Sequence, residues 1–262
     1  LVLELGRTLD VEVDQYAVNV PPEAVEATRR IHRERDHWVK VKTQHELRWE
    51  SLLVSLGAAV TKPKPSTKVE RIRDCFGQPL PQTTQDELQR LQDAVLLARK
   101  HIRAVEAVQI DALKQVREGK ASEHAAMVEQ VWQLMGWLGV GVHTAWPVVF
   151  EAFGWRAFKN RRQVGSFMGL TATPFDSGNS TREQGISKCG PPKLRAMMVE
   201  LAWRWIRHQP DSDLTRWFQE KFAAGKASRK RGIVALARRL SIQLWQYLAH
   251  GVIPEGVRLK EA

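Results

Sequence analysis

Cysteine and tyrosine are nearly absent from this chain, with two of each among 262 residues. Cys75 and Cys189 stand far apart in the sequence and form no CxxC pair. Neither a disulfide framework nor a zinc knuckle is supported, so cysteine usage favours a reducing cytoplasm. Hydrophobic residues make up 43% of the chain, which suffices for the core of one large domain or two modest ones.

The usual signatures of metal and nucleotide sites are also missing. The sequence holds no HExxH and no P-loop, and its eight histidines show no metal-ligand spacing. We interpret His143 and His208 as hydrogen-bonded residues at helix ends. The one membrane-like run, residues 134–150, is interrupted by three glycines, by His143 and by Pro147. This pattern favours a buried turn between helices, so we expect no membrane partner.

Acidic residues are scarce in the second part of the chain. Residues 155–262 carry 20 Lys and Arg against 8 Asp and Glu, whereas residues 1–154 carry 20 against 21. The whole net charge of +11 therefore comes from the second part, which also shows no paired-carboxylate motif. Clustered cations neutralise phosphates and release counterions, so a polyanion is the expected partner. A solvated basic face without a partner is the alternative.

Two long helices are predicted in the first part. The first starts at Pro21-Pro22, follows a seven-residue apolar repeat and ends at Gly57. The second starts with a capping box of Thr84 and Glu87 and keeps a strict 3-4 spacing from Leu88 to Gly119. Such helices pair as a coiled coil, either with each other in a hairpin or with a second chain. Plain core helices of a bundle are the alternative.

Shorter helices are predicted in the second part, at 122–135, 192–207, 212–224 and 228–249. The turn "GWLGVGVHTAWPVV" after the first of them resembles a helix-hairpin-helix motif, in which Gly139 and Gly141 would let backbone N–H groups approach a phosphate. A tight interhelical turn is the plain alternative. The last helix carries five arginines and lysines beside an apolar face.

The stretch "FDSGNSTREQGISKCG", residues 175–190, is predicted to be a polar loop between two packed helical segments. It offers three serine hydroxyls, a glycine that would let a backbone pass close to a phosphate, and two cations that could neutralise phosphoryl oxygens. These are Ser177, Ser180, Ser187, Gly178, Arg182 and Lys188. Composition alone favours a phosphate clamp without chemistry. Ser187, near the next helix, is expected to cap that helix.

The chain resembles one transposase family in an ordered string of residues, not in a lone motif. The string consists of the Ser177-Gly178 pair, Arg182, Gly185-Ile186-Ser187-Lys188, Gly190 and Leu194-Arg195. "FKNRRQVGSFMGLTATP" and "LGVGVHTA" upstream, and "VNVPPEAVEATRRIHRERDHWVKVKTQHELRWESLLVSLG" near the start, are similar to segments of the same family. This family is that of the insertion-sequence "one hundred and ten" transposases, also called bridge-RNA-guided serine recombinases.

The resemblance implies an N-terminal RuvC-like domain with a metal-binding acidic tetrad, a coiled coil, and a transposase domain with a nucleophilic serine. Ser177 matches that serine, and Arg182 and Lys188 fall on matching basic positions. Pro191 stands where the family commonly has asparagine. Asp10, Glu12 and Asp14 do not reproduce the tetrad, so we expect no metal or other cofactor bound by this chain, and Mg²⁺ only with a RuvC-like domain.

The combined expectation is an all-α protein with three regions. Residues 1–20 would be a linker, 21–120 a coiled-coil hairpin, and 121–262 a basic, helix-hairpin-helix-like transposase domain. The expected nucleic-acid-binding residues are Gly139, Gly141, Arg161, Arg162, Gly178, Arg182, Lys188, Lys193, Arg195, Arg229, Lys230 and Arg231.

The expected function is serine-mediated DNA strand exchange in transposition, with the metal-binding half supplied by another polypeptide. A non-catalytic DNA- or RNA-binding module is the alternative. The expected partners are DNA, a structured guide RNA, further copies of the chain joined as a dimer or tetramer through the coiled coil, and a separate RuvC-like polypeptide. The expected location is the bacterial or archaeal cytoplasm, associated with the nucleoid.

Overall fold

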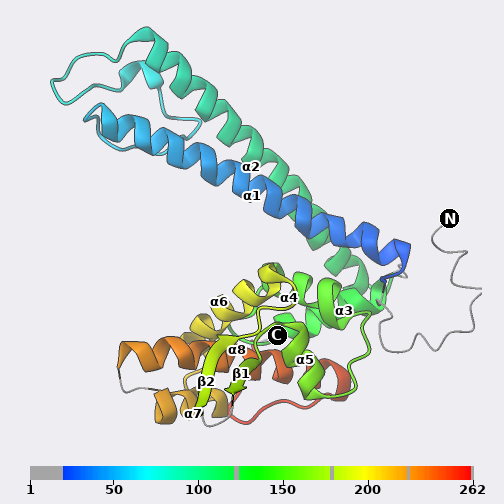
Figure 1. Ribbon diagram of the computed structural model, residues 1–262. Coiled ribbons are helices and arrows are strands. Elements are labelled where there is room, and N and C mark those ends of the chain that lie inside the picture. Colours follow the sequence, from blue (N-terminus) through cyan, green and yellow to red (C-terminus); the bar gives the residue numbers. More distant parts are fainter. Residues whose placement is uncertain (1–19, 121–123, 178–179, 223–224, 261–262) are drawn as a thin grey trace, which may run out of the picture.

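The computed structural model describes residues 20–120, 124–177, 180–222 and 225–260, with the backbone alone at 174–184 and 226–227. The expected linker at 1–20 lies almost entirely outside the described residues. A long pair of helices extends as an arm from a compact helical domain (Figure 1). The expected all-α class is confirmed, with one two-stranded sheet as the exception. No helix among the described residues is long and apolar enough to cross a membrane.

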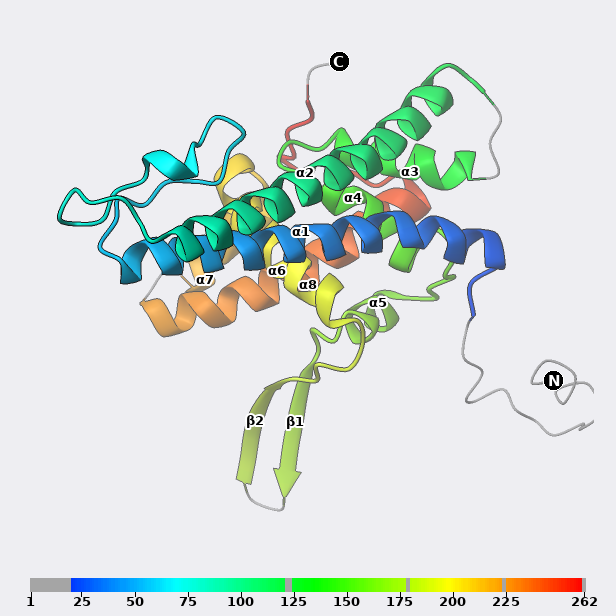
Figure 2. The same ribbon diagram turned by 90° about the horizontal axis from the view of Figure 1, so that it is seen from above.

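The arm consists of α1 (Glu23–Ser55) and α2 (Gln82–Arg117), which pack side by side (Figures 1 and 2). Ion pairs between them run in opposite directions along the two helices, as in Arg35–Glu106 at 2.8 Å and Arg48–Glu87 at 2.9 Å. The helices are therefore antiparallel. Each begins after a proline, because a fixed φ suits the first turn. The expected capping box is wrong, since Pro81 caps α2 and Thr84 lies inside it.

The apolar seam of α2 closes within one chain. Leu88, Val95 and Ala98 are fully buried, and Trp38 of α1 stacks on His101 of α2 with ring centroids 4.3 Å apart. The connecting segment folds back over the far end of the arm, where Trp49 donates its indole N–H to the carbonyl oxygen of Thr61 at 2.7 Å. Of the two pairings that the sequence leaves open, the structure adopts the intrachain hairpin.

The domain is built around its last helix, α8 (Lys226–His250), which packs against four other helices. These are α3 (Ala125–Met135), α5 (Arg161–Phe167), α6 (Pro192–His208) and α7 (Asp213–Phe222). Between α3 and α5 lie α4 (Val142–Val148) and the π-helical turn η3 (Val149–Phe153). Pro147 lies near the end of α4 and has no N–H to donate, and the wider π-helical turn follows it. The largest buried core residues are Trp137, Trp146, Phe150, Met168, Met198 and Trp205.

The helices expected at 122–135, 192–207, 212–224 and 228–249 are confirmed with small shifts of their ends. The expected loop at 175–190 is wrong over most of its length. Residues 172–186 form a β-hairpin of β1 (Ala172–Ser177) and β2 (Ser180–Ile186). The sequence signal of the hairpin is the dipeptide Gly178-Asn179, which is typical of a two-residue hairpin turn.

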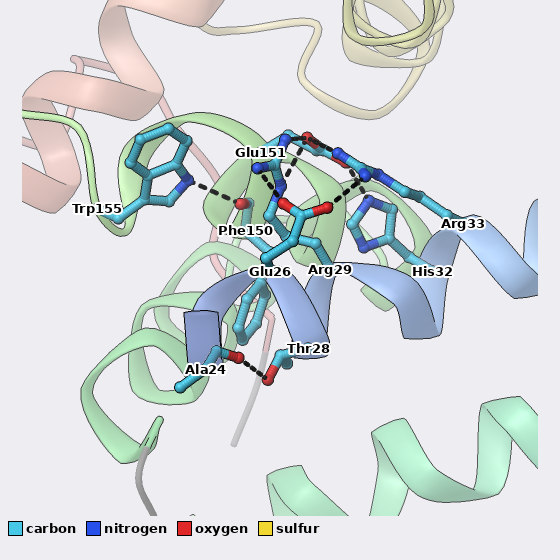
Figure 3. A network of polar contacts seen from close by, with 9 residues as sticks. All are labelled: Ala24, Glu26, Thr28, Arg29, His32, Arg33, Phe150, Glu151 and Trp155. Carbon is cyan, nitrogen blue, oxygen red and sulfur yellow. Dashed lines mark hydrogen bonds and ion pairs between the residues drawn. The ribbon is translucent and has the colours of Figure 1, made fainter. Parts of the chain in front are cut away.

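The carboxylate of Glu151 is at the centre of the largest polar contact between the arm and the domain (Figure 3). Glu151 of η3 accepts hydrogen bonds from three side chains of α1: Arg29 Nε at 3.0 Å, His32 Nε2 at 2.8 Å and Arg33 Nε at 2.8 Å. Glu26 pairs with both arginines from the other side. The Glu151 side chain is only 14% exposed, yet its three donors hold the pKa of its carboxyl well below the ordinary value.

His32 in this cluster makes the junction sensitive to acid. Burial lowers the pKa of its imidazole below the ordinary 6.5, and the nearby Lys193 and Arg33 lower it further, against the opposing effect of Glu151. The folded chain therefore binds fewer protons at His32 than the unfolded chain does just below pH 6.5. Stability falls as the pH drops through this window. Glu151 stays ionised there, because its own pKa lies far lower.

We therefore expect the free energy of unfolding, measured by urea titration, to decrease between pH 7.5 and pH 5.5, with His32 contributing at most about 1.4 kcal/mol per pH unit. His32→Gln should make the decrease shallower. His45→Gln on α1, away from Glu151, is the control and should leave it unchanged. His143, whose pKa burial also lowers, keeps part of the slope in both variants. Identical pH profiles for His32→Gln and the unchanged chain would contradict the assignment.

Candidate nucleic-acid interface

The β-hairpin projects away from the helical body (Figure 2). Its strands are antiparallel, and the Cα atoms of Ser177 and Ser180 face each other next to the turn, as do those of Phe175 and Arg182 nearer the body. Gly178 lies outside the described residues. The two candidate serines therefore lie together at the far end of the hairpin. Their positions in the strands do not decide which of them is the better candidate nucleophile.

The base of the hairpin is a close crossing of two backbone segments. Gly169 has φ +63° and Gly190 has φ +108°, values that side chains rarely allow. A Cβ on Gly190 would lie 2.0 Å from the carbonyl oxygen of Phe167, and one on Gly169 would lie 2.2 Å from that of Cys189. The crossing is therefore possible only because both residues lack a side chain.

Hydrogen bonds hold this crossing in place. The Ser187 N–H donates to the carbonyl oxygen of Thr171 at 2.8 Å, and the Lys188 N–H donates to that of Gly169 at 3.2 Å. Arg195 of α6 donates from Nη1 to the carbonyl oxygen of Lys188 at 2.9 Å. The expectation that Ser187 caps α6 is wrong, because its hydroxyl lies 3.3 Å from that of Thr171 and Pro191 occupies the cap position.

A groove of about 1180 Å³ opens beside the base of the hairpin, between α5, α7 and α8. Ala172, Gly185 and Ile186, at the ends of the two strands, form part of its wall. Six cations line it, and none of its described lining residues is acidic. The six are Arg161, Arg162, Lys230, Arg231, Arg238 and Arg239. This arrangement can hold several phosphates at once.

Four of these cations are expected from the sequence, and two are additions. Arg238 and Arg239 belong to the basic residues of α8, but only the folded domain brings them opposite α5. Gly165 of α5 makes room for Arg238, since a Cβ there would lie 3.0 Å from its Nε. Arg239 lies over the ring of Trp217, with its Cζ 3.7 Å from the ring centroid. Burial lowers the pKa of Arg239 without removing its charge.

Other expected binding residues have internal partners. Lys193 forms an ion pair with Asp36 of α1 and so links α6 to the arm. Arg195 is bonded to the hairpin base, and Arg229 lies over Trp203 with its Cζ 5.7 Å from the ring centroid, outside the groove. Lys188 is exposed at the hairpin base with φ +55°. Binding of nucleic acid by these residues stays a prediction.

The turn at Gly139 and Gly141 is packed against other parts of the chain. Gly139 has φ +94°, and a Cβ there would lie 3.2 Å from the Cβ of His208. The Leu138 N–H donates to the carbonyl oxygen of Arg258 at 3.0 Å, and Lys260 Nζ donates to that of Val140 at 2.8 Å. The C-terminal segment therefore covers this turn, which gives it a structural role between α3 and α4.

The sequence of this chain is similar to the sequences of known transposases. The family model described as "Transposase IS116/IS110/IS902 family" matches residues 133–216. Residues 133–216 are therefore similar to the transposases of this family. A protein of Sinorhizobium fredii named "Putative transposase y4rJ" is 36% identical over 250 residues, which are 93% of this chain and 62% of that protein. The "Transposase for insertion sequence element IS1111A" of Coxiella burnetii is 29% identical over 129 residues, 49% of this chain and 34% of that protein.

The chain thus spans less than two thirds of the length of either relative. The matched segment runs from α3 into α7 and contains the hairpin, its glycine crossing and both groove arginines of α5. The other four groove cations lie on α8, beyond the matched segment. The groove is therefore formed by the matched segment together with α8.

The described residues do not fit a resident metal ion, because they contain no group of three or more His, Cys, Asp and Glu side chains that could hold one. Asp10, Glu12 and Asp14 lie outside the described residues. Cys75 and Cys189 are exposed thiols.

The glycine crossing generates a sharp test of the hairpin's attachment. Gly190→Ala adds a methyl group that overlaps the Phe167 carbonyl, in addition to the strain of a positive φ of about 1–2 kcal/mol. Gly119→Ala is the matched control, because Gly119 also has a positive φ but nothing within 4 Å of the added Cβ. We expect Gly190→Ala to lower the free energy of unfolding more than the control does, and to speed hydrogen exchange of the amides at 180–186. Equal effects of the two substitutions would rule out the close crossing.

Proposed function

We propose that this chain is the DNA-binding and strand-exchanging part of a transposase. The match of residues 133–216 to a transposase family carries the proposal, and the groove with six cations beside the hairpin supports it. Cations from α5 and α8 bind the phosphates of the nucleic acid, while the hairpin extends from the same site to present Ser177. DNA in transposition is the substrate.

Ser177 is the proposed nucleophile. Attack of its hydroxyl oxygen on a phosphodiester forms a phosphoserine bond and breaks one phosphorus–oxygen bond to a deoxyribose, whose hydroxyl leaves. The bond energy is thereby kept for rejoining the strand to a new partner. The family resemblance of the Ser177-Gly178 pair supports this choice of serine. Arg182, which pairs with Phe175 near the far end of the hairpin, is proposed to neutralise charge on the attacked phosphate, whereas Lys188 lies at the hairpin base and is out of its reach.

The hairpin's length bears on where this reaction takes place. Five residue steps of about 3.3 Å place Ser177 roughly 17 Å along the strand from Ala172, which lies at the groove wall. A phosphate held in the groove is thus out of reach of Ser177 in this conformation. The attacked phosphate is accordingly proposed to lie on nucleic acid that continues beyond the groove, or on nucleic acid held by another polypeptide.

The remaining parts of the proposal concern partners. A RuvC-like polypeptide is proposed to supply Mg²⁺, since the described residues offer no metal site of their own. The family resemblance is the reason for proposing a structured guide RNA as a partner and association of several copies through the arm. Because the buried seam of α2 is used within the hairpin, such association would employ the outer surface of the arm.

The groove predicts a salt dependence of DNA binding. If six cations each neutralise one phosphate, the logarithm of affinity should fall against the logarithm of salt concentration with a slope of about −5. Replacing Lys230 and Arg231 by glutamine should make the slope shallower by about 2. The control replaces Arg90 and Arg103, which are exposed on α2 outside the groove, and should leave the slope almost unchanged. Equal effects of the two double variants, measured by fluorescence anisotropy, would refute the assignment of the groove.

The nucleophile is tested by trapping a covalent adduct. The full chain is combined with a RuvC-like polypeptide, Mg²⁺ and transposon-end DNA, and denaturing electrophoresis detects protein linked to DNA. We expect Ser177→Ala to abolish the adduct while DNA affinity changes less than about two-fold, since one hydroxyl adds little to phosphate-dominated binding. Ser180→Ala, its neighbour across the hairpin, should retain the adduct.

Loss of the adduct in Ser180→Ala but not in Ser177→Ala would show that the other serine is the nucleophile. DNA binding with no adduct under any of these conditions would favour the alternative function, a non-catalytic nucleic-acid-binding module.

A further inference from the structure

The floor of the groove is apolar. Binding of phosphates by the six cations does not need such an apolar surface. Between the basic residues the floor is lined by aliphatic and aromatic side chains from α7, from α8 and from the approach to the hairpin. These are Leu170, Leu214, Trp217, Phe222, Val234 and Ile242. A duplex presents sugar and phosphate to a protein and keeps the flat faces of its bases stacked inside. An apolar floor therefore has little to bind on a duplex backbone, whereas the bases of an unpaired strand offer apolar faces.

Trp217 provides a rigid stacking surface in this floor. It is half-buried, and its indole packs edge-on against Phe222 with ring centroids 5.4 Å apart. Arg239 lies over the indole with its Cζ 3.7 Å from the ring centroid. Both the indole and the guanidinium are planar groups on which nucleic-acid bases stack. The site thus combines stacking planes with phosphate ligands.

The cations are spaced along the groove rather than gathered at one point. Arg231 and Arg238 lie seven residues apart on α8, and a rise of about 1.5 Å per residue separates their Cα atoms by roughly 10 Å. Arg161 and Arg162 face them from α5. The groove's volume of about 1180 Å³ exceeds the roughly 300–1,000 Å³ of pockets that enclose one small ligand. Its size and charge fit a short stretch of polynucleotide better than a single nucleotide.

We propose that this groove binds an unpaired stretch of DNA or RNA, with bases against the apolar floor around Trp217 and phosphates on the arginines and lysine of α5 and α8. The inference rests on the proposed function in that it names the form of nucleic acid that the same site takes. A domain that exchanges strands meets such unpaired segments when a duplex is opened.

The experiment measures binding of the full chain to fluorescently labelled 15-nucleotide probes by anisotropy at one fixed salt concentration. The probes are a single-stranded DNA, the RNA of the same sequence, the corresponding DNA duplex, and a single-stranded DNA with three central abasic positions. We expect either single strand to bind at least about ten-fold more tightly than the duplex. The abasic probe keeps every phosphate but loses three stacked bases, so its affinity should fall at least about five-fold.

A pair of variants locates the stacking surface. Trp217→Leu should remove most of the difference between the intact and abasic single strands. Trp203→Leu is the matched control, because Trp203 also lies beneath an arginine, Arg229, but outside the groove. It should retain that difference. Circular dichroism and urea unfolding check that both variants fold, and the comparison of probes on the unchanged chain decides the question even where Trp217→Leu does not fold.

Tight binding of the single-stranded RNA or of the single-stranded DNA supports the inference, and the preferred one identifies which strand occupies the groove. Equal affinity for duplex and single strands, or equal affinity for intact and abasic strands, overturns the inference and leaves the proposed function standing. A chain that binds none of the four probes overturns the proposed function itself.

Discussion

The position of the arm depends on the carboxylate of Glu151. It brings two arginines and a histidine of α1 onto one turn of the domain, where Arg29 and His32 are largely withdrawn from water and Arg33 is partly exposed. Removing one partner of such a cluster leaves the others without compensation, which is far more unfavourable than the loss of a surface ion pair. Two weaker links join the same two bodies, Lys193 with Asp36 and His143 with Glu106 at 3.3 Å.

This attachment also separates the two kinds of charge in the molecule. Acidic side chains of the arm form ion pairs with arginines of the arm itself and with neighbouring cations, as in Arg35–Glu106 and Arg99–Glu46. The domain has fewer acidic than basic side chains, so part of its positive charge is not neutralised by its own acids. Because the arm contacts α3, α4 and η3, it leaves the face formed by α5, α7 and α8 uncovered (Figure 1). The groove and its cations lie on that face.

The hairpin is held by its backbone and not by a core of its own. Its strands project from the body, and its base is attached by the glycine crossing, main-chain hydrogen bonds, Arg195 and the packing of Ile186 against the core (Figure 2). A narrow, two-stranded element with so few attachments has limited intrinsic stability. Its direction therefore depends on Gly169, Gly190 and the start of α6. A site on such an element gains reach at the expense of rigidity, which suits the nucleophile proposed above.

Much of the helical architecture follows from the sequence alone. The apolar repeats, the prolines before α1 and α2 and the glycines after them predict the long helices, because local periodicity and backbone restriction act within a few residues. The location of the excess charge is equally a property of the sequence. The choice of hairpin pairing over a second chain was left open, because an apolar seam has the same residues whichever partner buries it.

The tertiary structure decided which residues meet. Glu151 reaches its α1 partners across more than a hundred residues, and Arg238 and Arg239 come opposite α5 only when α8 packs in the domain. In the folded chain Lys193 pairs with Asp36, and Arg195 donates to a main-chain carbonyl oxygen. Their charge alone predicts that both bind a ligand. The β-hairpin was overlooked because its polar residues have no apolar periodicity, and only the Gly178-Asn179 dipeptide marked its turn. Composition and spacing determine what each segment can form, whereas contacts between distant segments decide which charges remain available for binding.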